Sequence, residues 1–310
     1  MTQHDASSRA FEPQRARLTG LAYRMLGSLA EAEDVVQDAF LRVRDIDMRE
    51  IAEPAAYLHT TVARLCLDRL KSARARREVY VGTWLPEPIV DERAWLADPT
   101  ATAPDAALEQ ADDLSFALML TLERLTPPER TAFLLHDVFG QDYSAVAQVL
   151  KRSEAACRKL TERARAQVHE GAPRFEVEPE QEKRLALAFL SAASSGDQDA
   201  LTNVLAEDAI LYTDGGGNRR APLNPVFGAA RIGRFFAGIA RRADRATPEK
   251  VEFRRINQLP GFLATFAGGD VAVAAVEIRD GLIARVYVIN NPDKLRHLRS
   301  SQRPAGPGES

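Results

Sequence analysis

Hydrophobic positions recur at helical spacing through the first 77 residues of the chain. Ser28-Leu29-Ala30-Glu31 has the S-x-x-E form of a capping box, in which side chains satisfy the free backbone amides of a helix start. The apolar positions that follow it lie on one helix face, at Val35, Val36, Ala39, Phe40 and Val43. A further helix begins at Pro54 and has apolar positions at Tyr57, Leu58, Val62, Leu65 and Leu70. The pattern predicts an all-α domain over residues 1–77.

A second helical block covers residues 113–170 and contains a helix-turn-helix pattern. Thr126-Pro127-Pro128-Glu129 is a strong helix start, because proline suits the first helical positions and glutamate suits the third. We expect that helix to end at Gly140, and Ser144 and Ser153 to cap the two helices that follow. A short helix, a tight turn and a basic helix predict a unit whose second helix enters a DNA major groove. The same pattern also fits an ordinary three-helix packing unit.

Residues 78–112 have little regular periodicity and are rich in proline and alanine, which predicts a linker. It contains the stretch "VGTWLPEPIV", residues 81–90, with one of the two tryptophans of the chain and two prolines that prevent a regular helix.

The hydrophobic pattern changes in residues 180–298, where amphipathic helices come first and strand-like segments follow. Asp280-Gly281 separates two of these segments and is typical of a two-residue hairpin turn. Helices followed by an antiparallel meander predict an α+β domain. We expect residues 299–310 to form a flexible tail.

The net charge of −3 averages over strong local differences. Residues 64–77 and 151–165 are rich in lysine and arginine, whereas residues 91–113 are rich in aspartate and glutamate. Two basic blocks with an acidic spacer between them favour two contacts with a polyanion such as nucleic acid. The alternative is that both blocks are solvated helix faces.

The two cysteines, Cys66 and Cys157, lie inside separate helix-like runs. This predicts packing residues in a reducing cytoplasm, with neither a disulfide nor a metal site, and we expect no cofactor. The polar N-terminus and the absence of a long apolar run predict a cytoplasmic protein without membrane contact.

Three stretches together resemble the two domains of an extracytoplasmic-function (ECF) sigma factor. They are "AEDVVQDAFLRV", "AYLHTTVARLCLDRLKSARARRE" and "LTPPERTAFLLHDVFGQDYSAVAQVLKRSEAACRKLTERARAQV", within about residues 11–170. The resemblance implies an initiation subunit of bacterial RNA polymerase. Its first domain would open and read the −10 promoter element, and its second would read the −35 element and contact the β flap of the polymerase.

The resemblance also assigns roles to individual residues. Binding to the β′ clamp of core polymerase is implied for Glu33, Asp34, Gln37 and Asp38. Contact with the melted −10 strand, where cations neutralise phosphates, is implied for Arg64, Asp68, Arg69, Lys71 and Arg74. The loop from Asp45 to Glu53 matches one that captures a flipped base, and the nearby aromatic residues are Tyr57 and His59. Recognition of the −35 element, with Arg158 as the candidate for a guanine or backbone contact, is implied for Ser153, Glu154, Ala156, Arg158, Lys159 and Arg163.

Residues 180–298 resemble a SnoaL-like (NTF2-like) cone, a curved antiparallel sheet wrapped by helices. ECF sigma factors with this appendage have three marks, and the chain has all of them: Trp84-Leu85-Pro86-Glu87-Pro88, Asp214-Gly215-Gly216-Gly217 and Asn291-Pro292-Asp293-Lys294-Leu295. Asn218 departs from the lysine that usually follows the glycines. We expect Trp84 and Leu85 to pack near Asp214 and Asn291. An interdomain regulatory role is therefore predicted for Trp84, Leu85, Pro86, Asp214, Gly215, Gly216, Asn291, Pro292, Asp293 and Lys294.

Other roles of the C-terminal domain compete with this one. An enzyme could use Asp214 as an acid, but no histidine lies between His169 and His297. Phosphate binding by the glycine triplet fits less well than a tight turn with positive φ. A ligand-sensing pocket stays open beneath the regulatory role, and fusion would make a separate anti-sigma protein unnecessary. The main alternative for the whole chain is a one-component helix-turn-helix regulator with a ligand-sensing domain.

Overall fold

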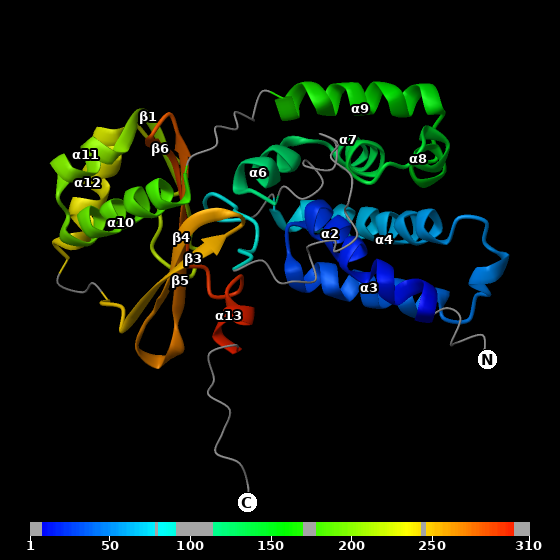
Figure 1. Ribbon diagram of the computed structural model, residues 1–310, viewed down its shortest axis with the longest axis horizontal. Helices are drawn as coiled ribbons and strands as arrows, with labels where there is room; N and C mark the ends of the chain where they lie inside the picture. The colour runs from blue at the N-terminus through cyan, green and yellow to red at the C-terminus, as the bar shows by residue number, and fades with distance from the viewer. Residues whose placement is uncertain (1–7, 78–79, 91–113, 170–177, 243–245, 301–310) are drawn as a thin grey trace, which may run out of the picture. The chain divides into compact units, whose positions relative to one another are not determined.

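The computed structural model describes residues 8–77, 80–90, 114–169, 178–242 and 246–300. These residues form two compact units, coloured along the chain in Figure 1. The first contains residues 8–77 and 114–169, and the second contains residues 80–90, 178–242 and 246–300. The two predicted sigma domains thus fall in one unit, and the proline-rich stretch 80–90 falls with the C-terminal residues.

The first unit begins with a helical group that runs from residue 12 to residue 77. It contains η1 Glu12–Gln14, α2 Arg15–Leu26, α3 Leu29–Val43, η2 Met48–Glu50 and α4 Pro54–Arg77. The predicted cap of α3 is present, because the Ser28 hydroxyl oxygen accepts a hydrogen bond from the backbone N–H of Glu31 at 3.2 Å. Gly27 ends α2 with φ of 69°, in the left-handed region that glycine adopts without strain. Cys66 and Cys157 are both free and buried.

The second helical group of this unit is α6 Phe116–Arg124, α7 Pro127–Phe133, η3 Leu134–Val138, α8 Tyr143–Leu150 and α9 Glu154–His169. The η3 segment is a π-helical turn that continues α7 towards Gly140. Ser153 caps α9 as predicted, and its hydroxyl accepts from the Ala156 amide at 3.3 Å. The expectation that Ser144 caps α8 is wrong. Asp142 accepts from the Ala145 amide at 2.8 Å instead, and Ser144 donates to the Asp142 carboxylate.

The two helical groups of the first unit are joined by buried contacts. Arg130 of α7 is 3% exposed, and its Nη1 donates to the backbone oxygen of Met25 in α2 at 2.5 Å. The same nitrogen lies 2.7 Å from the Glu123 carboxylate. The rings of His59 in α4 and Phe139 lie 5.3 Å apart. These residues are distant in the sequence, so the packing of one group on the other depends on tertiary contacts.

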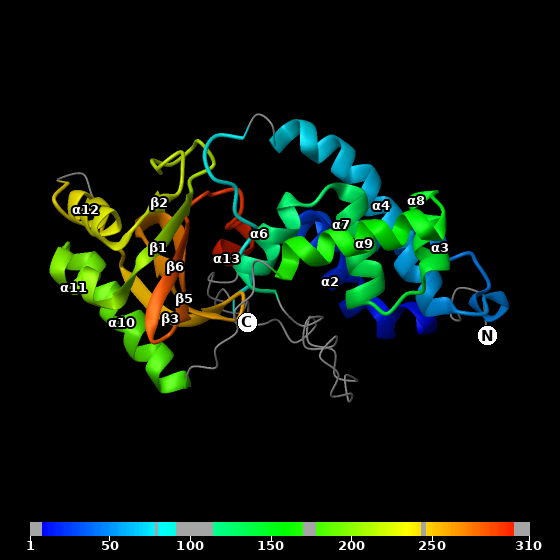
Figure 2. The ribbon, with the colours of Figure 1, turned by 90° about the horizontal axis from the view of Figure 1, so that it is seen from above.

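The second unit is α+β, as predicted. Its helices are α10 Pro179–Ser195, α11 Gln198–Val204, α12 Ala229–Ala240, the short η4 Ala267–Gly269 and α13 Arg296–Ser300. Its strands are β1 Leu205–Asp214, β2 Val226–Phe227, β3 Lys250–Ile256, β4 Leu259–Thr265, β5 Val271–Arg279 and β6 Leu282–Ile289. Figure 2 shows α10, α11 and α12 on one side of the sheet.

The sheet has the order β2-β1-β6-β5-β4-β3. Strands β3 to β6 form the predicted antiparallel meander, and Asp280 and Gly281 have φ of 53° and 75° in the turn between β5 and β6. The sheet is mixed rather than wholly antiparallel, because β1 pairs parallel with β6. This pairing places Asp214, at the end of β1, beside Ile289 at the end of β6. The motif that begins at Asp214 and the motif at residues 291–295 therefore lie at the same edge of the unit.

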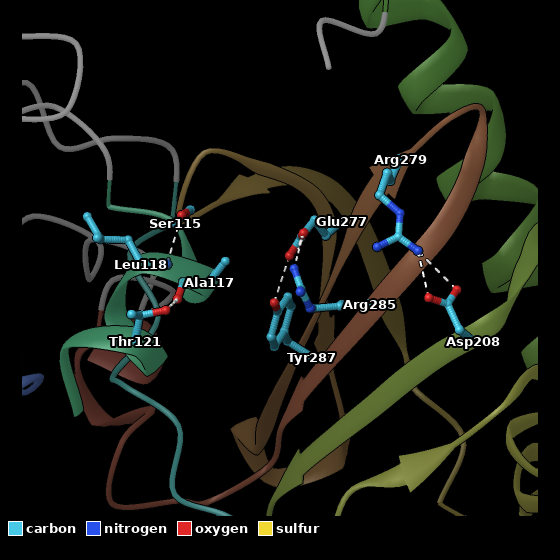
Figure 3. A network of polar contacts seen from close by, with 9 residues as sticks. All are labelled: Ser115, Ala117, Leu118, Thr121, Asp208, Glu277, Arg279, Arg285 and Tyr287. Atoms are coloured by element: carbon cyan, nitrogen blue, oxygen red, sulfur yellow. Dashed lines mark hydrogen bonds and ion pairs between the residues drawn. The ribbon is translucent and has the colours of Figure 1, made fainter. Parts of the chain in front are cut away.

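Alternation along the strands sends one set of side chains into the helix-covered core and the other to the opposite face. The core includes Phe189, Leu211, Ile232 and Val286. The opposite face carries Glu277, whose carboxylate accepts from Tyr287 at 2.8 Å and pairs with Arg285. Figure 3 shows these three side chains, and also the Arg279–Asp208 ion pair at 2.8 Å between β5 and β1. Within the described ranges, no helix combines the length and apolar character that a bilayer crossing needs.

Candidate functional site

The α3 helix presents a polar face that contains the residues predicted to bind polymerase. Glu33, Asp34 and Gln37 are exposed, and Asp38 is half-buried. Arg69 of α4 reaches across to this face, with Nη2 at 2.9 Å from Asp38 and Nη1 at 3.6 Å from Asp34. An arginine predicted to contact DNA therefore neutralises two of the acids predicted to contact polymerase.

The other predicted −10 residues lie along α4. Arg64 and Asp68 are exposed, and Arg64 Nη2 donates to the backbone oxygen of Gln148 in α8 at 3.1 Å. The side chains of Lys71 and Arg74 lie outside the described residues. In the Asp45–Glu53 loop, Asp47 caps η2 and forms a bidentate pair with Arg49, which lowers the pKa of Asp47 to about 2.

Of the two aromatic residues near this loop, only Tyr57 is partly exposed. His59 is 2% exposed and packs against Phe139, so its imidazole has no surface for base stacking. Burial, with a smaller contribution from the positive charge of Arg17, lowers the pKa of His59 to about 4.

The buried His59 predicts an acid-sensitive first unit. The unfolded chain binds a proton below pH 6.5, whereas the folded chain resists protonation until about pH 4. Stability is therefore complete above pH 6.5 and is lost as pH falls towards 4, by about 2 kcal/mol at pH 5. Urea unfolding at pH 7.5 and 5.0 should show this loss, and His59→Phe should remove it. An equal pH dependence in both proteins would contradict the prediction.

The α9 helix carries the residues predicted to read the −35 element. Glu154, Arg158, Lys159 and Arg163 are exposed, Ala156 is half-buried, and Ser153 is the cap. Arg158 Nη2 pairs with Glu154 at 3.0 Å and its guanidinium lies 5.0 Å from the centroid of the Tyr143 ring. Arg165, on the same helix, forms a bidentate pair with Asp137 and so links α9 to η3.

In the second unit the Asp214 carboxylate is fully buried and binds residues from three segments. It accepts hydrogen bonds from the backbone N–H of Leu85 at 2.8 Å, from the Tyr80 hydroxyl, and from the Gly216 amide at 3.1 Å. Lys294 Nζ lies 2.6 Å from Asp214 Oδ2. A buried carboxylate with this many donors holds the segments together, and we call Tyr80, Leu85, Asp214 and Lys294 the hub.

Lys294 completes the hub from the C-terminal side. Its ammonium also donates to the backbone oxygen of Leu85 and lies 4.3 Å from the Trp84 ring centroid and 4.9 Å from that of Tyr80. Aromatic faces attract such a cation, most strongly when water is excluded. Asn291 Nδ2 donates to the Tyr80 hydroxyl at 2.8 Å, and the Asn291 side-chain oxygen accepts from the Asp293 amide. Pro86 is buried, whereas Pro292 is half-buried next to these groups.

The structure therefore brings together the three marks found in the sequence, while their regulatory role stays a prediction. Sequence reasoning missed Tyr80, which lies just before the tryptophan mark. It also missed Asn257, which accepts from the Ile89 amide at 2.9 Å and donates to the Ile89 oxygen at 2.8 Å, and His297, which lies 3.0 Å from the Pro88 oxygen. Burial raises the pKa of Tyr80 above its usual value, helped by the adjacent Asp214, so its hydroxyl stays protonated as a donor.

The glycine triplet forms a tight turn against the hub. Gly216 and Gly217 have φ of 60° and 75°, and a Cβ on Gly216 would lie 2.3 Å from Asn291 Nδ2. A Cβ on Gly215 would lie 2.5 Å from the Arg219 backbone oxygen. The turn explains the glycines without a bound phosphate.

Gly216→Ala should destabilise the second unit more than Gly217→Ala. Both substitutions carry the cost of a positive φ, but only the first forces a methyl group into Asn291, because Gly217 faces Val81 at 3.4 Å. We expect an additional loss of about 1–3 kcal/mol for Gly216→Ala in urea unfolding. Equal losses for the two variants would show that the Asn291 contact is unimportant.

A separate cavity of about 410 Å³ lies at the start of α12 and is also lined by residues of α11, β1 and β2. Its lining includes the exposed ring of Phe227 and the side chains of Arg231 and Arg234. Asp214 does not line it and is already engaged by the hub. Asp214, the candidate acid for proton transfer, therefore has a structural role in the hub.

Two stretches match known protein families. Residues 10–76 match the family described as Sigma-70 region 2, and residues 115–168 match Sigma-70, region 4. The chain is 37% identical over 305 residues to the ECF RNA polymerase sigma factor SigJ of Mycobacterium tuberculosis H37Rv, covering 96% of each chain. It is 34% identical to the probable ECF RNA polymerase sigma factor SigI of the same species, covering 97% of this chain and 98% of that one.

A solved structure extends the similarity to the three-dimensional fold. The crystal structure of the M. tuberculosis extracytoplasmic function sigma factor SigJ has a TM-score of 0.69 and 35% sequence identity. The match covers 92% of this chain and 97% of that chain. It therefore includes both helical groups and the α+β unit.

Proposed function

The chain belongs to the ECF family of RNA polymerase sigma factors, and on this premise we propose that its second unit controls how its two sigma regions reach promoter DNA. A sigma factor is not an enzyme; it is an initiation factor that works with core RNA polymerase on promoter DNA. The polymerase performs the phosphoryl chemistry. A one-component regulator, the main alternative, has no need of region 2, which the chain carries over residues 10–76.

For region 2, we assign α3 to the β′ clamp of core polymerase and α4 to the melted −10 strand. The exposure of Glu33, Asp34 and Gln37 on one helix face supports the first assignment. The exposure of Arg64 and Asp68 supports the second, and Lys71 and Arg74 continue along the same helix. Because Arg69 pairs with Asp34 and Asp38, we assign it to holding the acidic face of α3 rather than to DNA.

For region 4, we assign α9 to the major groove of the −35 element, with the β flap as the polymerase contact. Four polar side chains on α9 are exposed, which supports this assignment. The helix that presents them is capped by Ser153 and buries its opposite face. Arg158 is assigned the guanine contact, for which a bidentate arginine contributes about 1–3 kcal/mol of discrimination.

The observation that carries the control proposal is the capture of residues 80–90 by the hub. This segment follows α4 after only residues 78 and 79, and it precedes region 4 in the sequence. Region 4 is thus joined to the second unit at both ends, by residues 91–113 and 170–177. Releasing residues 80–90 would lengthen the tether between regions 2 and 4 by up to about 35 Å of extended chain.

The covalent attachment of the second unit to the sigma regions also affects which other partners the protein needs. A covalently joined domain acts at an effective concentration of about millimolar order, so the proposal needs no separate anti-sigma protein. It leaves the cavity beside α12 open to a small-molecule ligand, and it places the protein in the cytoplasm with the polymerase, away from the membrane.

In vitro transcription with purified core polymerase and a genomic promoter library tests both parts. Core polymerase with the full chain should initiate at a defined set of promoters, and Asp214→Asn should raise the transcript yield relative to Asp208→Asn, an exposed control. If the holoenzyme never initiates while the chain alone shifts a duplex operator, promoter-directing activity is refuted. Equal yields from the two variants would refute only control through the hub.

A further inference from the structure

The Tyr143 ring at the start of α8 packs against two side chains from neighbouring segments. The His136 ring stacks on it with centroids 3.9 Å apart and planes inclined by 28°. The guanidinium of Arg158, from α9, lies 5.0 Å from the same ring centroid. The helix that precedes the recognition helix thus supplies an aromatic face to the arginine assigned to base recognition.

We infer that Tyr143 is a positioning residue that determines −35 sequence specificity by holding Arg158 in a conformation ready to meet a base. The inference rests on the proposed role of Arg158. It adds a residue on a different helix that need not touch DNA itself.

Two contacts restrict the Arg158 side chain from different sides. The Tyr143 ring attracts the guanidinium through its face, and Glu154 accepts from Nη2 at 3.0 Å, one helical turn earlier. The Arg158 side chain nevertheless stays 52% exposed, so its guanidinium group remains accessible to a base. A free arginine has many rotamers, and a bidentate contact with guanine accepts few of them. Restricting the rotamers before binding favours the correct base more than the alternatives.

The tyrosine ring is itself held by the turn between η3 and α8. His136 Nδ1 hydrogen-bonds to the Gln141 backbone oxygen at 2.7 Å, which fixes the imidazole that stacks on Tyr143. Asp142 caps α8 one residue before Tyr143. The turn before α8, the Tyr143 ring and Arg158 therefore form a continuous chain of contacts that ends on the recognition helix.

The experiment uses the full chain with core polymerase on a promoter library that has a randomised −35 element and a fixed −10 element. Transcripts are counted for wild type, Tyr143→Leu, Tyr143→Phe, Arg158→Ala and the Tyr143→Leu/Arg158→Ala double variant. Arg158→Ala should reduce base preference at one −35 position by roughly tenfold. Tyr143→Leu should reduce preference at that same position by about two- to fivefold. Tyr143→Phe, which keeps the ring, should behave as wild type.

The double variant decides whether tyrosine acts through arginine. We expect it to match Arg158→Ala, because a positioning residue has nothing left to position. A uniform loss over all −35 sequences in Tyr143→Leu, or an additive loss in the double variant, overturns the inference while leaving the role of Arg158 intact. An unchanged −35 preference in Arg158→Ala overturns the assignment of Arg158 itself and the inference with it.

Discussion

Asp214→Asn is expected to destabilise the second unit by about 3–5 kcal/mol, because it removes the carboxylate that pairs with the buried Lys294 ammonium. Asp214 is fully buried, and the Lys294 side chain is only 10% exposed, so water cannot replace the lost carboxylate. The amide also cannot accept from the Tyr80 hydroxyl, the Leu85 amide and Lys294 with the strength of a charged group.

Urea unfolding, followed by Trp84 fluorescence in a Trp95→Phe background, measures this effect. The Trp84 emission should shift towards that of exposed tryptophan at lower urea concentrations than in the parent protein. Asp208→Asn is the matched control, because it removes an aspartate from the same strand whose partner, Arg279, lies at the surface. An exposed pair contributes about 0–1 kcal/mol. Similar midpoints for the two variants would mean that the hub does not hold residues 80–90.

The local elements could be predicted from the sequence because their signals are local. Ser28 and Ser153 cap their helices with their own side chains, and Asp280-Gly281 turns the hairpin through two positive φ angles. The Ser144 cap failed for a local reason as well. Asp142, two residues earlier, is a stronger acceptor for the free amides of α8, and Ser144 donates to it.

Tertiary partners were predictable only where a motif marked them. Asp214 and Asn291 were expected beside Trp84 and Leu85, because all four residues belong to motifs that mark a known subgroup. Tyr80 and Asn257 hold the same segment without a mark, and no periodicity distinguishes them from surface residues. The burial of His59 has no local signal either, because its partner Phe139 is 80 residues away and belongs to the other helical group. Parallel pairing of β1 with β6 was missed since it joins strands distant in the sequence.

Arg130→Met is expected to weaken the packing of region 4 on region 2 by about 1.5–3 kcal/mol, because it removes a charge-assisted hydrogen bond between the two regions. The guanidinium is 4% exposed and joins α7 to the buried Met25 backbone oxygen of region 2, whereas its pair with Glu123 lies within region 4. Arg165→Met is the matched control, because its bidentate pair with Asp137 lies wholly within region 4.

Spin labels on exposed positions Leu41 of α3 and Gln167 of α9 report the separation of the two regions. We expect one narrow distance distribution in the parent and in Arg165→Met, and a second, longer population in Arg130→Met. The longer population would also free Arg64, which in the closed packing donates to the Gln148 oxygen of α8 instead of facing a −10 phosphate. Opening should therefore raise promoter-dependent transcription, because reading two separated elements requires region 2 and region 4 to part. If the spin-label distance distribution of a folded Arg130→Met protein is unchanged, other contacts hold the two regions together.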